Sequence, residues 1–404
     1  MEKYFVKTVN EKKNINVKVP GSKSITNRAL ILGALSNDVC TLEGVSFCDD
    51  TIAMMECLMD LGFEVHIDDE TCIVEIKGEG GEIPNTDATI DVKSSGTTAR
   101  FISAMLAVCG GEYTVNSTKQ MKARPMETFT DALAGLGVEI NYLEEEGHLP
   151  FRIKSDGLKD FDIEINTDES TQYASAMLLT QSVSNANITL TGKRVDGSYI
   201  EMTKKMVDAF GPKYKVEPDV SAACYFYAMA LILGSKAKVE GVHIDSLQGD
   251  IKFLNLLKDM GADVVDEEDG VLVDASLVTS FEGLDVDMHD YSDQALTYSV
   301  IAVFAKTPSV IRNVGHIRHQ ESNRMMVIKS ELEKIGAMVE IKGDDIFITP
   351  GALKGSEIET YDDHRVAMSF AIAGLKIEDI VIQNPKCCEK TFAEYFDILD
   401  VIVS

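Results

Sequence analysis

The fold is decided by a short stretch, LGVEI at residues 136–140, that recurs along the chain. In this stretch an amphipathic helix ends in an apolar residue, a glycine follows, and an alternating strand begins. Related copies surround Gly62, Gly211, Gly261 and Gly336. A glycine after the last helical turn is the usual left-handed cap, and alternation with period two indicates a half-buried strand. Five such junctions predict repeated helix–strand units and an α/β fold of the α+β type.

The spacing of these glycines is even except at one place. The intervals are 75 residues from Gly62 to Gly137, 74 to Gly211, 50 to Gly261 and 75 to Gly336. The interval after Gly211 is therefore about 25 residues short, which is room for two or three strands with their turns. Either the protein has lost a hairpin here or the printed sequence omits a segment, and the evenness of the other intervals favours the omission.

The composition limits the class of protein. The chain has 404 residues, 45% of them hydrophobic, which is enough for two or more cores. A net charge of −28 argues against nucleic acid or an anionic membrane as partner. No apolar run reaches the length of a membrane span, and the N-terminus lacks the apolar stretch of a signal peptide. The eight cysteines show neither CxxC pairs nor metal-ligand spacing with His. We expect a cytoplasmic protein with reduced thiols and no metal.

Basic residues in Gly- and Ser-rich loops stand out against this acidic composition. The segment PGSKSITNR at residues 20–28 makes a turn, and Ser22 or Ser24 can cap the helix that follows. Lys23 and Arg28 at a helix N-terminus form a ready site for an anion. The glycine spacing is not that of a Walker A loop. A capped helix with solvated basic residues explains the segment about as well.

Three further segments share this character. KSSGTTAR at residues 93–100 opens into an apolar helix, and Gly96 allows a ligand close to the backbone. MKARPM at residues 121–126 places Arg124 at a helix entry, and Ser170-Thr171-Gln172 begins another helix. Ordinary N-cap loops explain each of these segments when it is taken alone.

The C-terminal half supplies the titratable groups. Asp293 enters an apolar helix, and Glu321 and Arg324 are three residues apart, which predicts one helical face. YDDHR at residues 361–365 precedes another apolar helix, and Lys390 follows a cysteine pair. Asp293 and Glu321 can serve as general base and acid, although a solvated charge explains each residue in isolation.

Taken together and in order, these segments resemble the enolpyruvyl transferase family. The match runs from Val17 to Phe396. The elements PGSKSxxNRA, GTTxR, RPM, DHRxAM and K-x-F are weak singly and specific as an ordered set. The resemblance implies two similar domains built from six βαβαββ units. One domain would comprise residues 1–20 plus 216–404 and the other residues 21–215, with the active site in the cleft between them.

The resemblance also implies the reaction. The enolpyruvyl group of phosphoenolpyruvate would pass to the 5-hydroxyl of 3-phosphoshikimate, releasing phosphate, on the shikimate pathway to chorismate and the aromatic amino acids. It implies no metal and no cofactor, small-molecule substrates as the only partners, and a monomer.

Site residues are carried over position by position. Asp293 would accept the proton of the attacking hydroxyl, and Glu321, helped by Lys23, would protonate the methylene carbon. The residues implied for 3-phosphoshikimate are Lys23, Ser24, Arg28, Ser170, Thr171, Gln172, Tyr199, Asp293, His316 and Gln320. Those implied for phosphoenolpyruvate are Lys23, Ser94, Gly96, Arg124, Gln172, Arg324, Arg365 and Lys390.

Some positions depart from the family pattern and keep alternatives open. Ser94 stands where relatives usually have Asn, Asp196 where a hydroxyl meets the substrate phosphate, and Gln320 where most have Lys. The sister enzyme that acts on UDP-N-acetylglucosamine is one alternative, but it has a PGxKN-type opening and a reactive cysteine that this chain lacks. A non-catalytic or weakly active binder of shikimate-type phosphates is another. The presence of both Asp293 and Glu321 speaks against it.

We expect the Gln320→Lys variant to raise kcat/KM about tenfold. A charge-assisted hydrogen bond contributes about 1.5–3 kcal/mol against about 0.5–1.5 for a neutral one, and 1.4 kcal/mol is one decade in rate. Steady-state kinetics of the variant test this, and an unchanged kcat/KM contradicts it.

Overall fold

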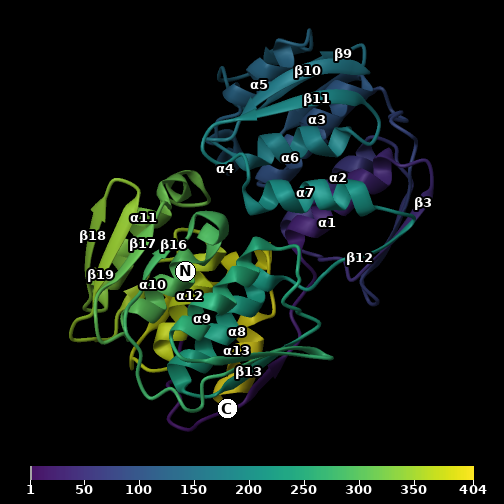
Figure 1. Cartoon of the computed structure of the whole chain (residues 1–404). Coiled ribbons are helices and arrows are strands. Elements are labelled where there is room, and N and C mark those ends of the chain that lie inside the picture. Colours follow the sequence, from purple (N-terminus) through teal and green to yellow (C-terminus); the bar gives the residue numbers. More distant parts are fainter. Residues whose placement is uncertain (1) are drawn as a thin grey trace. The chain divides into compact units, whose positions relative to one another are not determined.

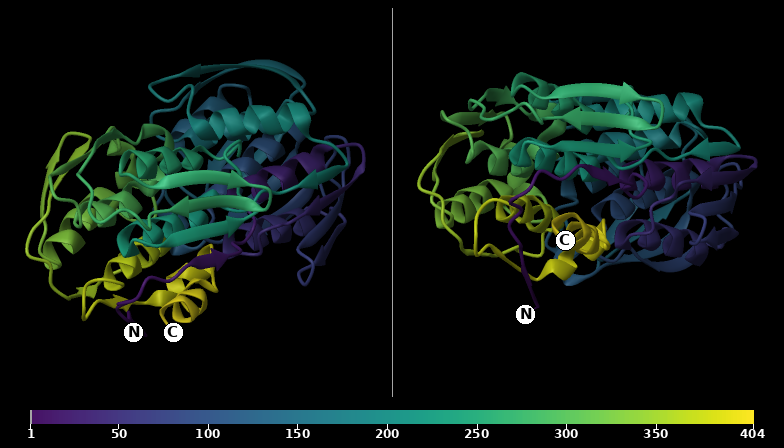
Figure 2. Two further views of the ribbon diagram at one scale, coloured as in Figure 1. Left: turned by 60° about the horizontal axis from the view of Figure 1, so that its bottom comes forward. Right: turned by 90° about the horizontal axis from the view of Figure 1, so that it is seen from below.

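The computed structural model describes residues 2–404, which fold into two compact units. Unit 1 comprises Met1–Pro20 and Pro218–Ser404, and unit 2 comprises Gly21–Glu217 (Figure 1). The chain therefore passes between the units after Pro20 and again after Glu217. Both ends of the chain belong to unit 1 (Figure 2), where the Tyr4 hydroxyl donates to Asp400 Oδ1 at 2.8 Å.

Four of the six sheets share one topology. Across each of these sheets, the first two strands are parallel to each other. The strand in the third place is antiparallel to both of its neighbours, and it follows the outer, fourth strand in the sequence. In unit 2 these sheets are β12 (Lys213–Lys215), β3 (Val39–Glu43), β5 (Ile73–Lys77), β4 (Val65–Asp68), and β6 (Asp87–Asp91), β7 (Gly111–Asn116), β9 (Phe151–Ser155), β8 (Glu139–Tyr142). In unit 1 they are β2 (Ile15–Val17), β13 (Lys236–Glu240), β15 (Gly270–Asp274), β14 (Asp263–Glu267), and β16 (Asp285–Asp287), β17 (Ser309–Arg312), β19 (Asp345–Thr349), β18 (Met338–Lys342).

Helices connect the strands of every repeat. Those of unit 2 are α1 (Lys23–Leu35), α2 (Asp49–Asp60), α3 (Gly96–Cys109), α4 (Lys119–Lys122), α5 (Glu127–Ala134), α6 (Thr171–Thr180) and α7 (Ser198–Ala209). Those of unit 1 are α8 (Val220–Leu233), α9 (Phe253–Asp259), α10 (Ala295–Ala302), α11 (Arg324–Lys334), α12 (His364–Gly374) and α13 (Tyr395–Val403). Four 3₁₀ helices, η1 (Gly249–Lys252), η2 (His289–Gln294), η3 (Gly315–His319) and η4 (Pro385–Lys390), complete unit 1. The predicted fold class, a mixed α/β fold of repeated units, is confirmed.

Two strands, β2 and β12, pair with strands that lie far from them in the sequence. β2 precedes α1 in the chain but pairs in parallel with β13 of unit 1. β12 precedes α8 but pairs in parallel with β3 of unit 2. β2 lies before the first crossing and β13 lies after the second, so the whole of unit 2 separates them in the sequence. β12 and β3 lie near the two ends of unit 2, with no crossing between them.

The remaining two sheets are smaller. One has three strands, β20 (Glu357–Ile358), β21 (Val381–Gln383) and β1 (Lys3–Phe5). The other has only two, β10 (Asp160–Asn166) and β11 (Asn185–Thr191), which are parallel. Its repeat continues through α7 to Gly211 and lacks the third and fourth strands. The short interval in the glycine spacing therefore corresponds to an absent strand pair in the described residues 2–404.

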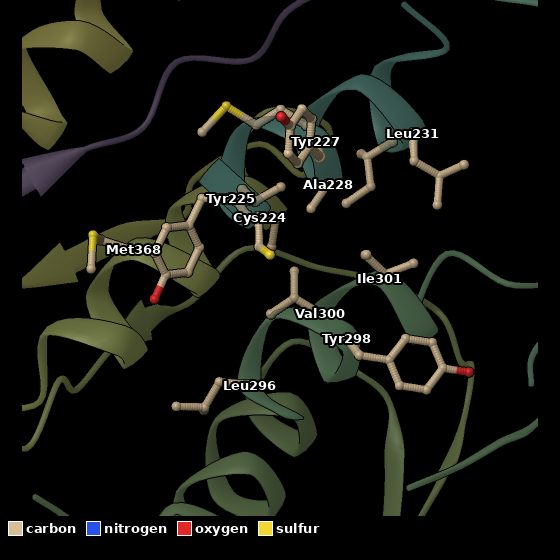
Figure 3. Close-up of a cluster of buried hydrophobic side chains, with 14 of the residues drawn as sticks. Cys224, Tyr225, Tyr227, Ala228, Leu231, Leu296, Tyr298, Val300, Ile301 and Met368 are labelled. Atoms are coloured by element: carbon tan, nitrogen blue, oxygen red, sulfur yellow. The ribbon is translucent and has the colours of Figure 1, made fainter. Parts of the chain in front are cut away.

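The core of unit 1 forms around α8. Thirteen of its fourteen residues are buried, as expected for a helix that is apolar on all sides. Figure 3 shows Tyr225 and Ala228 of α8 near Val300 of α10 and Met368 of α12. Asp219 caps the start of the helix by accepting from the Ala222 amide, and Gly234 ends it with φ 59°. This core holds α10 and α12. Asp293 lies two residues before α10, and Arg365 lies in the first turn of α12.

The predicted glycine caps are confirmed at four junctions and wrong at one. Gly62, Gly137, Gly261 and Gly336 have φ between 89° and 103°. Gly211 is outside the left-handed region. The reason is that the other four glycines turn the chain into the third strand of their own sheet, whereas the chain leaves α7 through an extended Phe210 and proceeds to β12.

We expect Gly137→Ala to destabilise unit 2 by about 1–2 kcal/mol, because an L-residue is strained in this conformation. Gly211→Ala is a matched control in the same unit. A Cβ meets nothing within 4 Å at either position, so the two variants differ in backbone conformation alone. Urea unfolding compares their midpoints, and an equal shift for both variants contradicts the prediction.

Candidate active site

In unit 2 most of the predicted site residues lie near the N-termini of four helices that pack together, α1, α3, α6 and α7, whereas Arg124 lies between α4 and α5. Ser22, Ser95 and Ser170 cap the first three by accepting hydrogen bonds from the amides of Ile25, Thr98 and Gln172. These caps confirm the predicted helix starts. They place Lys23, Gly96 and Thr171 in first turns, where free backbone amides and the helix dipole favour an anion.

Arg28 is a buried cation that has no carboxylate partner among residues 2–404. Its guanidinium donates to Thr203 Oγ1 at 2.7 Å, to Ser175 Oγ at 3.0 Å and to the Ser24 carbonyl at 2.8 Å. All of these acceptors are neutral. Burial lowers the pKa of Arg28 to about 10. Its charge is thus removed from water and left uncompensated, an arrangement that an incoming anion relieves.

Two further arginines converge on Gly96. A Cβ at this position would lie 2.5 Å from Arg100 Nη1 and 2.9 Å from Arg124 Nη1. Burial, and then the charge of Arg124, lower the pKa of Arg100. Arg124 Nη2 is buried without a hydrogen-bond partner. Arg100 is not among the site residues implied by the resemblance, and only its place at the end of GTTxR signals it.

Arg100 also fixes the orientation of Gln172. Its Nη1 donates to Gln172 Oε1 at 2.7 Å, and Gln172 Nε2 lies 3.3 Å from Thr97 Oγ1. With the amide oxygen engaged, the NH₂ group is the end of Gln172 that remains available to donate.

Other predicted residues of unit 2 have different surroundings. Lys23 pairs with the nearly buried Asp50 at 2.9 Å. Ser94 Oγ lies 2.6 Å from Thr118 Oγ1, and the Tyr199 ring lies 5.8 Å from Arg28 Cζ. Asp196 is exposed, and it precedes the first residue of α7 by two positions.

In unit 1, Arg324 gathers three carboxylates. Its guanidinium lies 3.0 Å from Asp293 Oδ1, 2.8 Å from Glu321 Oε2 and 2.8 Å from Asp363 Oδ2. It also donates to Gln320 Oε1. Although burial acts to lower it, the surrounding carboxylates, Asp363 foremost, raise the pKa of Arg324. The sequence did not predict that Gln320 supplies an acceptor to Arg324. A lysine cannot fill this role, so the loss of this contact opposes the rise in kcat/KM expected of Gln320→Lys.

One local prediction is wrong. Glu321 and Arg324 were expected on one helical face, but α11 begins at Arg324 with Asn323 as its N-cap. Glu321 lies in the turn before the helix. The two residues still meet because the guanidinium reaches back toward this turn.

Asp293 is held from two sides. Arg324 contacts one of its oxygens, and Arg365 Nη2 lies 3.0 Å from the other. Lys390 Nζ lies 3.6 Å from Glu321 Oε1, and His316 Nε2 lies 2.8 Å from Ser292 Oγ. Unit 1 thus brings together Asp293, Glu321, Arg324, Arg365 and Lys390.

A second carboxylate lies behind Asp293. Asp250, from η1, is 5% exposed, and its Oδ2 accepts from Gln294 Nε2 at 2.8 Å and from Ser221 Oγ. Burial and then the charge of Asp293 raise the pKa of Asp250 to about 6, while Arg365 acts in the opposite direction. No motif in the sequence signals Asp250, because its partners come from α8 and η2.

The two units therefore present different chemistry. Arg28, Arg100 and Arg124 of unit 2 form no ion pair with a carboxylate within the described residues 2–404. The cations of unit 1 are matched to Asp293, Glu321 and Asp363. Unit 2 is suited to anionic ligands, and unit 1 to proton transfer beside ligand charges.

The same range contains no group of three or more His, Cys, Asp or Glu side chains arranged to hold a metal ion. Over these residues, no helix has the combination of length and apolar character that spanning a bilayer requires.

Comparison with known proteins identifies the family. A family model described as EPSP synthase (3-phosphoshikimate 1-carboxyvinyltransferase) matches residues 9–213 and 211–399. The chain belongs to this family. A 3-phosphoshikimate 1-carboxyvinyltransferase of Nostoc punctiforme is 36% identical, with 98% of each chain covered. One of a Shewanella species is also 36% identical, with 94% of this chain and 95% of the relative covered.

A solved structure of EPSP synthase from Acinetobacter baumannii shares the fold. Its TM-score is 0.81 at 23% sequence identity, with 100% of this chain and 98% of that chain covered. The alignment to the Nostoc relative spans 419 residues, more than the 404 of this chain, so the relative has residues that this EPSP synthase family member lacks. The two family-model matches meet at residues 211–213. This is the end of the third repeat of unit 2, the repeat that contains β10 and β11.

We expect Asp250→Asn to stabilise the protein at pH 8 by roughly 1–3 kcal/mol. The folded-state pKa of Asp250 is raised, so its contribution to stability is present below the unfolded pKa near 4 and is lost as pH rises through about 6. Asparagine keeps an oxygen for Ser221 and Gln294 but carries no charge. Urea unfolding at pH 5 and pH 8 measures the difference.

Asp274→Asn is the control of opposite sign. Its pairing with Lys236 lowers the pKa of Asp274 to about 2, so removing this carboxylate should reduce stability at neutral pH. A loss of stability in Asp250→Asn at pH 8 contradicts the prediction.

Proposed function

We propose that this chain transfers the enolpyruvyl group of phosphoenolpyruvate to the 5-hydroxyl of 3-phosphoshikimate, with release of phosphate. One observation supports the proposal beyond family membership. Arginines of unit 2 that form no ion pair within residues 2–404 can bind anionic substrates, and unit 1 supplies a base, Asp293, and an acid, Glu321, each held by Arg324. The relatives that share 36% of the sequence over nearly the whole chain bear the name of this activity.

Residues of unit 2 are proposed to bind the phosphates and carboxylates. Arg28, with Ser170 and Thr171, suits the phosphorylated sugar-like substrate, because its charge is desolvated and has no counter-ion. Arg124 suits phosphoenolpyruvate, because its guanidinium lies next to Gly96, where a ligand can come close to the backbone. A side chain at Gly96 would displace the guanidinium groups. Lys23 and the amide donor of Gln172 complete this set.

Residues of unit 1 are proposed to move the protons. Asp293 accepts the proton of the 5-hydroxyl group while the hydroxyl oxygen forms a bond to C2 of phosphoenolpyruvate. Glu321 donates a proton to C3, giving a tetrahedral adduct. The C–O bond to phosphate then breaks as Glu321 takes a proton back from C3, which restores the double bond. The proton held by Asp293 leaves with the phosphate, so both carboxyl groups return to their starting state. Arg324, Arg365 and Lys390 stabilise the charge that shifts during these steps.

The alternatives are less well supported. The matching family model is that of the shikimate enzyme, which disfavours the sister enzyme that acts on UDP-N-acetylglucosamine. A non-catalytic binder has no need of two carboxylates held on guanidinium groups. Gln320 and Asp196 remain the positions at which this chain departs from the family, and their effect on rate stays a prediction.

We expect Asp293→Asn to reduce kcat by about 10²–10⁴-fold, the usual contribution of a positioned general base. Phosphate release from the two substrates gives the rate, and calorimetry checks that 3-phosphoshikimate still binds. Asp259→Asn removes an exposed carboxylate of the same unit and should leave kcat unchanged. A wild-type chain that binds both substrates without releasing phosphate is a binder, and a fully active Asp293→Asn refutes the assigned base.

A further inference from the structure

The truncated third repeat leaves one edge of β11 without a strand. In each of the four-stranded sheets the equivalent strand has an antiparallel neighbour on this side, as β7 has β9 and β17 has β19. In residues 2–404, β11 pairs only with β10.

The backbone direction at this edge follows from the hydrogen bonds to β10. The Asn185 amide donates to the Lys159 carbonyl, and the Thr191 carbonyl accepts from the Thr167 amide. Odd-numbered residues of β11 thus bond to β10, and the amides of Ala186, Ile188 and Leu190 face the open side. The Ala186 carbonyl accepts from Gln181 Nε2, which confirms this direction.

The open edge also lacks the usual protection against pairing. Sheet edges are normally guarded by charged side chains, by proline, or by being very short. Ten of the twelve edge strands contain a charged residue, for example Asp160, Asp162 and Glu164 in β10. The two exceptions are β2, with three residues, and β11, with seven. β11 (NANITLT) is therefore the one long unguarded edge in the described chain.

We propose that β11 is a self-association surface, on which a second copy of this chain pairs its own β11 in antiparallel orientation. A two-fold axis at Ile188 sets Ile188 opposite its counterpart and Ala186 opposite Leu190 of the other copy. The outward amides and carbonyls then bond in pairs, and the Leu190 amide of the other copy replaces Gln181 Nε2 at the Ala186 carbonyl. A four-stranded sheet results, in the order β10, β11, β11, β10.

A second copy of the chain meets no like charge on β11 itself. The chain carries a net charge of −28, so most of its faces repel one another in a self-contact. Along β11 the facing side chains are Asn, Thr, Ala, Ile and Leu, and no like charges meet. The acidic residues of β10 are bonded within the sheet, since Asn185 and Asn187 donate to Asp160 and Asp162 at 2.7 Å.

A single strand pair is a small interface, so the dimer should be weak and reversible. Sedimentation velocity and light scattering should show the mass rising from 44.3 kDa toward twice that value as the concentration increases. Hydrogen exchange at the amides of Ile188 and Leu190 should slow over the same range. This differs from the monomer that the resemblance implies.

Thr189→Lys tests the surface. Its side chain is exposed and lies opposite Glu164 of β10, so the variant should fold while placing a cation on the edge. We expect the dimer to be lost. Ile188→Pro is a second variant, which removes an outward amide without touching the bonds to β10. Thr89→Lys makes the same change on the exposed side of β6, another edge strand of unit 2, and should leave the dimer intact.

A wild-type chain that stays at 44.3 kDa at every concentration overturns the proposal. So does a dimer that survives both β11 variants, because it must form elsewhere. The readout is mass and not turnover, so the result is independent of the proposed function.

Discussion

The site of unit 1 depends on the burial of Arg324 among carboxylates. Arg324 starts α11, and its partners come from η2, from the turn before α11, and from the N-cap of α12. A buried guanidinium is tolerable only when its donors are satisfied by charge, and removing one partner of such a group typically costs about 3–5 kcal/mol. These ion pairs therefore hold three separate segments together. They also fix the positions of Asp293 and Glu321, which the proposed chemistry needs.

Unit 2 holds its buried guanidinium groups in a different way. The hydrogen bonds of Arg28 and Arg100 go to hydroxyls, carbonyls and an amide, and not to carboxylates. These neutral acceptors keep the guanidinium groups in place and leave their charge uncompensated. A protein with a net charge of −28 thereby presents locally positive helix ends to anionic substrates. The acidic remainder of the surface does not cancel this effect, because surface charges more than a Debye length of about 10 Å away are largely screened.

The third repeat shows what a βαβαββ unit needs in order to fold. β10 and β11 remain a parallel pair without the last two strands, because α5 and α6 pack against them and Asn–Asp hydrogen bonds link the two strands. The departure is confined to the sheet edge and to Gly211, which has no strand of its own to turn into. The core positions of α6 and α7 that hold Arg28 are unaffected.

The sequence by itself determined the repeat period, the short interval after Gly211, the left-handed caps at four glycines, and the serine-capped helix starts. These features are local, since they depend on residues a few positions apart. The ordered motifs also indicated the family and most of the candidate site residues. The tertiary structure decided how the charges are matched. Arg100 with Arg124, Asp363 and Gln320 with Arg324, and Asp250 behind Asp293 are brought together by separate helices and turns. No periodicity or spacing records these contacts, because the energy of a buried charge depends on every group packed around it, wherever that group lies in the chain.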